Sequence, residues 1–318
     1  MVRLALLSDI HSNLPALEAV LDDFKACKPD KIIVAGDAVN AGPFSAQVVE
    51  RLLNEKCVVI RGNNELYLTD WQNARMPDSW RHYTVPPYTL AQLGPDLLNV
   101  IAAWPDRLSL RFPGAAAVRV VHGSPRGPFE PMSPITPDDD LTLMLESVEE
   151  QTVLAAHTHL TMDRQVGGWH LLNPGAVGNP LDGDLRASYM IVEGDANGWR
   201  GVLRKVTFDT ERVYREFERT GFVEQTGVIG HLIVKEYHTA QMEVSPFLEW
   251  HRAVCPEEPV TMALCWTVIA ILIDWRFARP LTELISSGQA AELNGFASKH
   301  RLAILQPRYN PRNDTVYR

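Results

Sequence analysis

Apolar runs and helically spaced apolar residues alternate along the first part of the chain. Residues 2–7, 31–35 and 57–60 are short, continuous apolar runs, which is the pattern of strands buried on both faces. Between them, apolar residues recur at helical spacing over 14–24 and 46–54, so each gap predicts a helix. Strand–helix–strand units of this kind form parallel sheets through right-handed crossovers. The pattern therefore predicts an α/β fold built on a parallel sheet.

The second half of the pattern has shorter strands and tighter turns. Six further apolar runs lie at 117–121, 153–156, 162–166, 169–172, 187–192 and 201–208. The Gly pair between Val166 and Trp169 predicts a hairpin. Residues 73–105 begin with a stretch rich in Pro, Trp, Tyr and Arg that breaks the rhythm, and we interpret them as a lid or insertion. A four-layer αββα sandwich, with two sheets packed face to face between helices, accommodates all of these elements.

Residues able to bind metal ions follow almost every predicted strand in the first 160 positions. They are Asp9, His11, Asp37, Asn63, His122, His157 and His159. Because ligands of open α/β sheets bind beyond the carboxyl ends of the strands, we expect these loops to converge on one crevice. Taken one at a time, each residue has an ordinary explanation as a cap, a turn residue or a structural His. Their ordered recurrence favours a site for divalent metals such as Mn, Fe, Ni or Zn over Ca.

The motifs that carry these residues resemble those of one enzyme family. DxH at Asp9, GDxx at Asp37, GNxx at Asn63, a His before Gly at His122 and HxH at His157 follow the ordered signature of the calcineurin-like metallophosphoesterases. The sequences of segments 11–21, 122–130 and 173–180 are similar to those of the small prokaryotic phosphodiesterase branch of this family. The resemblance extends over about residues 1–220.

The resemblance implies an αββα fold, a site for two divalent metals and hydrolysis of a phosphodiester or phosphomonoester by a metal-bridging hydroxide. It assigns one metal to Asp9, His11 and His159 and the other to Asn63, His122 and His157, with Asp37 as the bridge. Two divalent cations carry more positive charge than two aspartates neutralise, so such a site attracts phosphate and lowers the pKa of the bridging water. Residues 173–175 resemble the family's NPG loop, which we expect to shape the HxH loop.

Two positions depart from the family pattern, and one of them, Ala156 for the more usual Gly before His157, is a small change that we expect to be harmless. Relatives with strong monoesterase activity have GNHE or GNHD, whose His protonates the leaving oxygen, whereas this chain has GNNE with Asn64 in that place. An amide delivers no proton, so a general-acid contribution of about 10²–10⁴-fold is absent or comes from another residue. We therefore expect Asn64 and Asp37 to act in catalysis, Asn64 to contact the substrate, and esters with good leaving groups to be preferred. His82, inside the 73–105 segment, is considered as a substitute acid.

Two arginines lie beside candidate ligands. Arg61 precedes Gly62 of the GNNE motif, and Arg126 follows His122 by four residues. The forked donors of a guanidinium suit contact with a phosphate, so both are candidate substrate-binding residues. A structural ion pair is the alternative for each.

Composition and charge narrow the functional classes. A chain of 318 residues with 46% hydrophobic content can bury a full core and still carry a small second module. The net charge of −9 argues against a nonspecific nucleic-acid binder and against a nuclease of the same superfamily, and favours a small phosphate ester or nucleotide-like substrate. The four cysteines form no CxxC pair, and the apolar N-terminal run is too short for a signal peptide, so we expect a cytoplasmic protein.

The chain divides, on this pattern, into a catalytic domain at 1–225 and a mainly helical extension at 226–318 with a polar tail from about 306. Within the extension, residues 260–273 carry no charge and predict a helix that is apolar almost all round and too short to span a membrane. Such a helix is buried within the extension or against a second subunit, which leaves a homodimer open.

A second functional hypothesis is a non-catalytic, metal-binding scaffold for protein assembly. A retromer subunit shares the implied fold, also lacks the His and serves assembly. The complete set of metal donors in this chain favours the enzyme.

Overall fold

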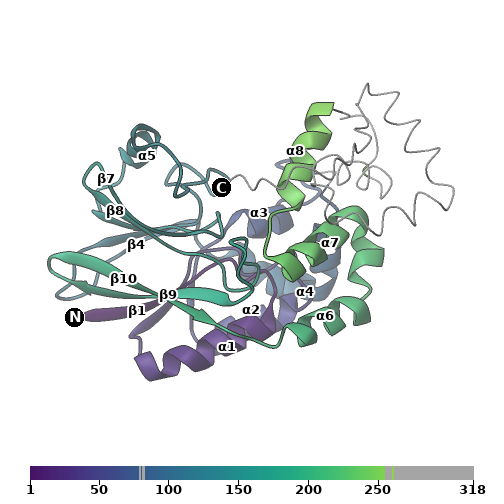
Figure 1. Ribbon diagram of the computed structural model, residues 1–318, viewed down its shortest axis with the longest axis horizontal. Coiled ribbons are helices and arrows are strands. Elements are labelled where there is room, and N and C mark those ends of the chain that lie inside the picture. Colours follow the sequence, from purple (N-terminus) through teal and green to yellow (C-terminus); the bar gives the residue numbers. More distant parts are fainter. Residues whose placement is uncertain (79, 81–82, 255–259, 261–318) are drawn as a thin grey trace, which may run out of the picture. The chain divides into compact units, whose positions relative to one another are not determined.

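Figure 1 shows the computed structural model, which describes residues 1–78, 80, 83–254 and 260. The chain forms two compact units, Met1–Val244 and Ser245–Arg318. Helix α7 (Phe222–Thr239) therefore belongs to the first unit, although the predicted domain boundary falls within it. The division at 225 and the homodimer stay predictions. His82, the apolar helix at 260–273 apart from Val260, and the polar tail lie outside the described residues.

The first unit is built on two five-stranded sheets. The first sheet has the order β10 (Gly198–Val206), β9 (Ala187–Asp195), β1 (Val2–Leu7), β2 (Lys31–Val34) and β3 (Val58–Val59). The second has the order β4 (Arg107–Leu110), β5 (Val118–Val121), β6 (Thr152–Leu154), β8 (Trp169–Pro174) and β7 (Thr161–Val166). In each sheet three neighbouring strands are parallel, β1–β2–β3 and β5–β6–β8, and the remaining strands add antiparallel edges.

Helices connect and cover these strands. The described helices are α1 (Leu14–Phe24), a 3₁₀ turn (Lys25–Cys27), α2 (Ser45–Asn54), α3 (Asn63–Thr69), α4 (Val85–Ala102), α5 (Asp138–Leu145), α6 (Thr210–Arg219), α7 and α8 (Val244–Val254). Asn13 caps α1 by accepting a hydrogen bond from the N–H of Ala16, and Pro15 occupies the first turn of that helix, where its missing N–H costs nothing.

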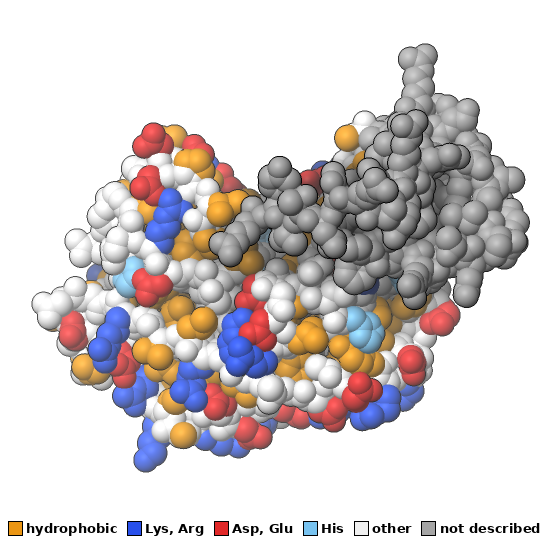
Figure 2. All heavy atoms as spheres, viewed as in Figure 1, with side chains coloured by type: hydrophobic (Ala, Val, Ile, Leu, Met, Phe, Trp, Pro, Cys, Tyr) orange, Lys and Arg blue, Asp and Glu red, His pale blue; other side chains and the backbone are white. Residues whose placement is uncertain are grey.

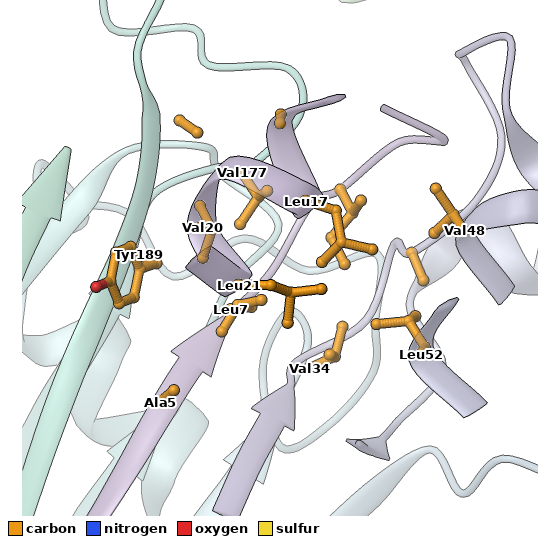
Figure 3. Close-up of a cluster of buried hydrophobic side chains, with 14 of the residues drawn as sticks. Ala5, Leu7, Leu17, Val20, Leu21, Val34, Val48, Leu52, Val177 and Tyr189 are labelled. Carbon is orange, nitrogen blue, oxygen red and sulfur yellow. The ribbon is translucent and has the colours of Figure 1, made fainter. Parts of the chain in front are cut away.

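Alternation along β1 explains the layers. Ala5 and Leu7 point to one face of the first sheet and pack against α1 and α2, as Figure 3 shows. Leu4 and Leu6 point to the opposite face and pack against side chains of β5, β6 and β8 in the second sheet. The far face of that sheet packs against Leu141 of α5. Helix, sheet, sheet and helix thus follow one another, and the predicted αββα class is confirmed.

The 73–105 segment contains a helix that the sequence pattern did not predict. Helix α4 starts with two prolines in its first turn, where proline is tolerated, and bends at Gly94, whose φ of 63° interrupts the helix just before Pro95. These residues read as helix breakers in the sequence, and the apolar residues between them pack with α2 and α3 instead. Whether the segment acts as a lid stays a prediction.

Two other expectations can be compared directly with the structure. The hairpin at Val166–Trp169 is present, because β7 and β8 pair antiparallel with those two residues opposite each other. Among the described residues, no helix is both long and apolar enough to cross a membrane. On the face shown in Figure 2, acidic and basic side chains are interspersed rather than gathered by sign.

Candidate metal centre

The loops after the parallel strands converge, as their shared direction requires. Backbone hydrogen bonds join the loop after β1 to the loop after β2, from Asp9 N to Gly36 O (3.1 Å) and from His11 N to Asp37 O (3.0 Å). Across the two sheets, the ring of His122, after β5, donates from Nδ1 to the carbonyl of Ala35 (2.8 Å). Six of the seven predicted metal ligands lie in loops that follow parallel strands, and Asn63, after β3, is the first residue of α3.

The first group of donors is Asp9, His11 and His159. The Nε2 atoms of the two imidazoles lie 3.1 Å apart, and Asp9 Oδ1 lies 3.3 Å from His159 Nε2. Each imidazole uses Nδ1 to donate to a backbone carbonyl, His11 to Asn40 (3.3 Å) and His159 to Asn179 (2.5 Å). Because a carbonyl only accepts, the proton of each neutral ring sits on Nδ1 and the lone pair of Nε2 faces the group.

These donors fit a cation. Asp9 Oδ1 is buried and accepts no hydrogen bond from any described residue. Two imidazole lone pairs and a buried carboxylate oxygen that face one another repel unless a positive charge lies among them. Nitrogen and carboxylate donors in this mixture are the ligands of transition metals rather than of Ca²⁺.

The second group is Asp37, His122 and His157, with Asn63 beside it. The ligand atoms of these three titratable residues lie within 4.8 Å of one another, as do those of the first group. Asn63 Oδ1 lies 2.9 Å from His122 Nε2. Asp37 faces both groups, with Oδ1 3.4 Å from His122 Nε2 and Oδ2 3.7 Å from His11 Nε2. The carboxylate of Asp37 therefore lies between the two groups, with one oxygen toward each.

Charge within the centre separates the histidines into two kinds. Burial, together with the charge of a neighbouring His, lowers the pKa of both His11 and His157 to about 4, so these rings are neutral at pH 7. Burial also lowers the pKa of His122, but Asp37 outweighs it and raises the pKa to about 9. Burial raises the pKa of Asp37, yet His122 and His11 outweigh it and hold the pKa well below its ordinary value. In the metal-free protein the second donor group thus holds a proton on His122 at pH 7, which a bound cation would displace.

The backbone at the centre is held in an uncommon conformation. Five of the seven candidate ligands have positive φ: Asp9 (51°), His11 (45°), Asp37 (53°), His157 (70°) and His159 (57°). Each such residue costs about 1–3 kcal/mol and persists only where the surrounding structure enforces it, which is typical of functional sites. This concentration of strain at the candidate ligands is independent support for their acting together.

Glu65, which the sequence pattern did not single out, fastens two of the loops together. Its buried carboxylate accepts hydrogen bonds from four backbone N–H groups: those of Asp37 (2.9 Å), Ala38 (2.8 Å), Val39 (3.2 Å) and Gly62 (2.6 Å). Burial and the nearby Asp37 raise its pKa above the ordinary value. The available sequence signal was its place as the third residue of α3, where a Glu commonly reaches back to the N-cap N–H.

Gly62 allows this arrangement because the backbone passes directly against the Asp37 side chain. A Cβ at Gly62 would lie 2.1 Å from Asp37 Oδ1. The side chain of Asn64, two residues on, donates from Nδ2 to Asp37 Oδ2 (2.5 Å), and its N–H donates to Asp37 Oδ1 (2.9 Å). Asn64 Oδ1 accepts from Asn40 Nδ2 (2.9 Å). Asn64 is thus beside the centre, held by hydrogen bonds on both ends of its amide.

The two arginines singled out in the sequence are both in ion pairs. Arg61 donates from Nε to Asp106 Oδ1 (2.9 Å), and Arg126 donates from Nε to Glu130 Oε2 (2.9 Å). The Arg126 side chain is 51% exposed, whereas that of Arg61 is 20% exposed. Their proposed contact with substrate phosphate would require each to exchange or share its carboxylate partner.

Two further segments support the ligand loops from behind. Asn173 donates from Nδ2 to Ala156 O (2.9 Å), so the loop at 173–175 does shape the HxH loop. From helix α7, the hydroxyl of Tyr237 donates to the carbonyl of His11 (2.8 Å), and Glu236 accepts from Asn179 Nδ2 (3.1 Å). Tyr237, 226 positions downstream of His11, thus contacts the DxH loop, a contact that no local sequence pattern indicated.

Comparison with known proteins places the chain among proteins with the same motifs. Residues 2–197, which include every candidate ligand, match the model of the calcineurin-like phosphoesterase superfamily domain. An uncharacterized protein of Methanocaldococcus jannaschii is 27% identical over 237 residues, covering 70% of this chain and 95% of that protein. Phosphodiesterase YfcE of Escherichia coli is 26% identical over 206 residues, covering 61% of this chain and 89% of the relative.

A solved structure extends the likeness to three dimensions. The metallophosphoesterase from Sphaerobacter thermophilus superposes with a TM-score of 0.59 at 27% identity, covering 75% of this chain and all of that one. Fold, ordered motifs and the two donor groups agree with this likeness and with the match over residues 2–197. The chain belongs to the calcineurin-like phosphoesterase superfamily, whose members depend on metals.

Proposed function

We propose that this chain is a two-metal phosphoesterase that hydrolyses a phosphodiester or phosphomonoester. The observation that carries the proposal is the position of Asp37, whose two carboxylate oxygens face His122 of one group of N and O donors and His11 of the other. The name of the Escherichia coli relative, a phosphodiesterase, supports an ester substrate of this class. A small or nucleotide-like ester agrees with the acidic net charge.

Asp9, His11 and His159 would hold one divalent ion, and Asn63, His122 and His157 the other, with Asp37 shared between them. When bound, the two ions supply a nucleophile from water at neutral pH and positive charge opposite the phosphoryl oxygens. The chain's own contribution is to keep these donors dry and oriented. Both tasks are met here by burial and by the backbone carbonyls that bind the Nδ1 atoms of His11, His122 and His159.

Asn64 limits the reaction to what an amide can do. Its Nδ2 already donates to Asp37, and no proton of an amide transfers to a leaving oxygen at neutral pH. Asn64 therefore orients Asp37 and contacts the substrate without acting as an acid. Hydrolysis should then depend steeply on leaving-group pKa, and aryl esters should react fastest. We also propose that Arg61 and Arg126 contact the phosphate. Arg126 lies four residues after His122, and its side chain is about half exposed.

The test is hydrolysis of bis(p-nitrophenyl) phosphate by purified protein loaded with Mn²⁺, with metal content measured on the same sample. The proposal expects turnover by the loaded wild type and none by the Asp37→Asn variant. Removing the metal with a chelator should abolish the wild-type turnover. A protein that holds two equivalents of Mn²⁺ and cleaves no aryl ester would contradict it. That result would favour the alternative of a non-catalytic, metal-binding scaffold.

A further inference from the structure

Four aromatic side chains form a cluster that is separate from the buried core. Tyr67 lies at its centre, with ring centroids 4.5 Å from Trp80, 4.8 Å from Tyr83 and 5.6 Å from Phe129. The ring centroids of Trp80 and Phe129 lie 5.8 Å apart. We call these four residues the aromatic wall. All four of these contacts are tilted or edge-on rather than face-to-face.

Two of the segments that carry candidate metal ligands, α3 and the loop after β5, also carry residues of this wall. Tyr67 follows Asn63 by four residues on α3, so the two side chains share one face of the helix on successive turns. Tyr83 bonds through its hydroxyl to Asn64 Oδ1 (3.3 Å), and Asn64 in turn donates to Asp37. The wall therefore begins two hydrogen bonds from the carboxylate that faces both donor groups.

Phe129 reaches the wall from the loop that starts at His122. This loop is folded tightly on itself: a Cβ at Gly123 would lie 2.7 Å from the carbonyl oxygen of Glu130 and 2.8 Å from those of Gly127 and Pro128. The bond from Arg126 Nε to Glu130 tightens it further. The tightly folded loop thus holds Phe129 against Tyr67 of α3 and against Trp80.

Exposure distinguishes the wall from ordinary core packing. Tyr67, Trp80 and Tyr83 are each partly exposed, and Phe129 is 43% exposed. An aromatic cluster that served only stability would bury its rings, as Tyr88 and Phe222 do, at 5% and 0% exposed. Partly exposed aromatic side chains beside the proposed phosphate-binding centre can stack with a planar group that is joined to the phosphate directly or through a sugar.

We propose that the aromatic wall binds a planar aromatic group of the substrate, by stacking, while the phosphate lies at the metal centre. The proposal rests on the proposed function and adds the substrate class: an ester of an aromatic alcohol or of a nucleoside. Stacking on one aromatic side chain changes affinity by about 5- to 150-fold on substitution to alanine. The donor groups would bind the phosphate that all such esters share. The aromatic wall would therefore select among esters by their organic group.

The experiment compares inhibitors that differ only in the planar group, in Mn²⁺-loaded full-length protein. AMP is compared with ribose 5-phosphate, and phenyl phosphate with ethyl phosphate, each as an inhibitor of bis(p-nitrophenyl) phosphate hydrolysis. We expect the aromatic member of at least one pair to bind 5-fold or more tightly. Preference for AMP identifies a nucleoside as the source of the ring, and preference for phenyl phosphate identifies an aryl alcohol.

Variants at Phe129 test whether the wall causes the preference. Phe129→Leu should bring the affinity ratio close to one, and Phe129→Tyr, which keeps the ring, should retain it. Val202→Ala, at an exposed apolar side chain on β10, is the matched control. Ratios near one for both pairs in the wild type, or a ratio that Phe129→Leu leaves unchanged, would overturn the proposal.

Failure of the proposed function gives a different result. If the loaded protein hydrolyses no ester, the same four ligands are titrated by calorimetry, and a preserved preference for the aromatic member still supports the wall. Loss of all four affinities in the loaded protein would reject the wall together with the phosphate-binding centre.

Discussion

The contact between α7 and the first DxH loop gives the sharpest prediction. Tyr237 is 5% exposed, and its hydroxyl donates to the carbonyl of His11 at 2.8 Å. Burial raises the pKa of Tyr237 well above its ordinary value, so the phenol stays a neutral donor throughout any practical assay. Tyr237→Phe removes this donor and leaves a buried carbonyl without it, which costs about 1–3 kcal/mol of stability.

The same change should weaken metal binding, because His11 is held at a φ of 45°. If the bond from Tyr237 maintains this conformation, relaxing it releases about 1–3 kcal/mol of strain. Mn²⁺ affinity at the group formed by Asp9, His11 and His159 should then fall by about 5- to 150-fold, since 1.4 kcal/mol is tenfold. The assay is titration with Mn²⁺ by calorimetry, with thermal unfolding of the metal-free protein measured in parallel.

Tyr88→Phe is the matched control. Tyr88 is also 5% exposed and donates its hydroxyl to Thr220 Oγ1 (2.8 Å), but it does not contact a candidate ligand. Both variants should lose similar stability, and only Tyr237→Phe should lose metal affinity. Equal Mn²⁺ affinity in the two variants would refute the reasoning that α7 positions His11.

Three further outcomes follow from the centre. Asp37→Ala should lower occupancy of both metals together, whereas His11→Ala should lower mainly one; elemental analysis that finds two equivalents in Asp37→Ala would end the bridging assignment. Asn64→His should speed hydrolysis of alkyl esters more than that of aryl esters, and an unchanged or slower alkyl rate in folded, metal-loaded protein would show that the missing acid is not what limits the enzyme. Glu65→Gln replaces one carboxylate oxygen, which accepts from two backbone N–H groups, by an NH₂ group that faces the same donors, so urea unfolding should show a loss of about 3–6 kcal/mol of stability. A loss below about 1 kcal/mol would contradict the role of Glu65 in joining the loops.

The local sequence pattern was enough to predict the central strands of the fold and the residues that meet at the edge of the sheets. The apolar run of β1 and the alternation of Leu4 and Leu6 with Ala5 and Leu7 reflect burial on both faces of a central strand. Residues that follow parallel strands must meet at one edge, and so the order of motifs along the chain was enough to predict that Asp9 and His159, 150 positions apart, lie together.

Other features depend on contacts between segments that are distant in sequence, and a local pattern carries no information about these. Helix α4 was missed because its prolines and Gly94 read as breakers, although packing against α2 and α3 tolerates them. The four backbone bonds of Glu65 exist only once the loops after β2 and β3 are brought together, and the ion pair of Arg61 needs Asp106 from 45 residues away. The contact of Tyr237 with His11 and the meeting of Tyr67 with Phe129 likewise arise only on folding, because side chains recognise neighbours in space rather than along the chain.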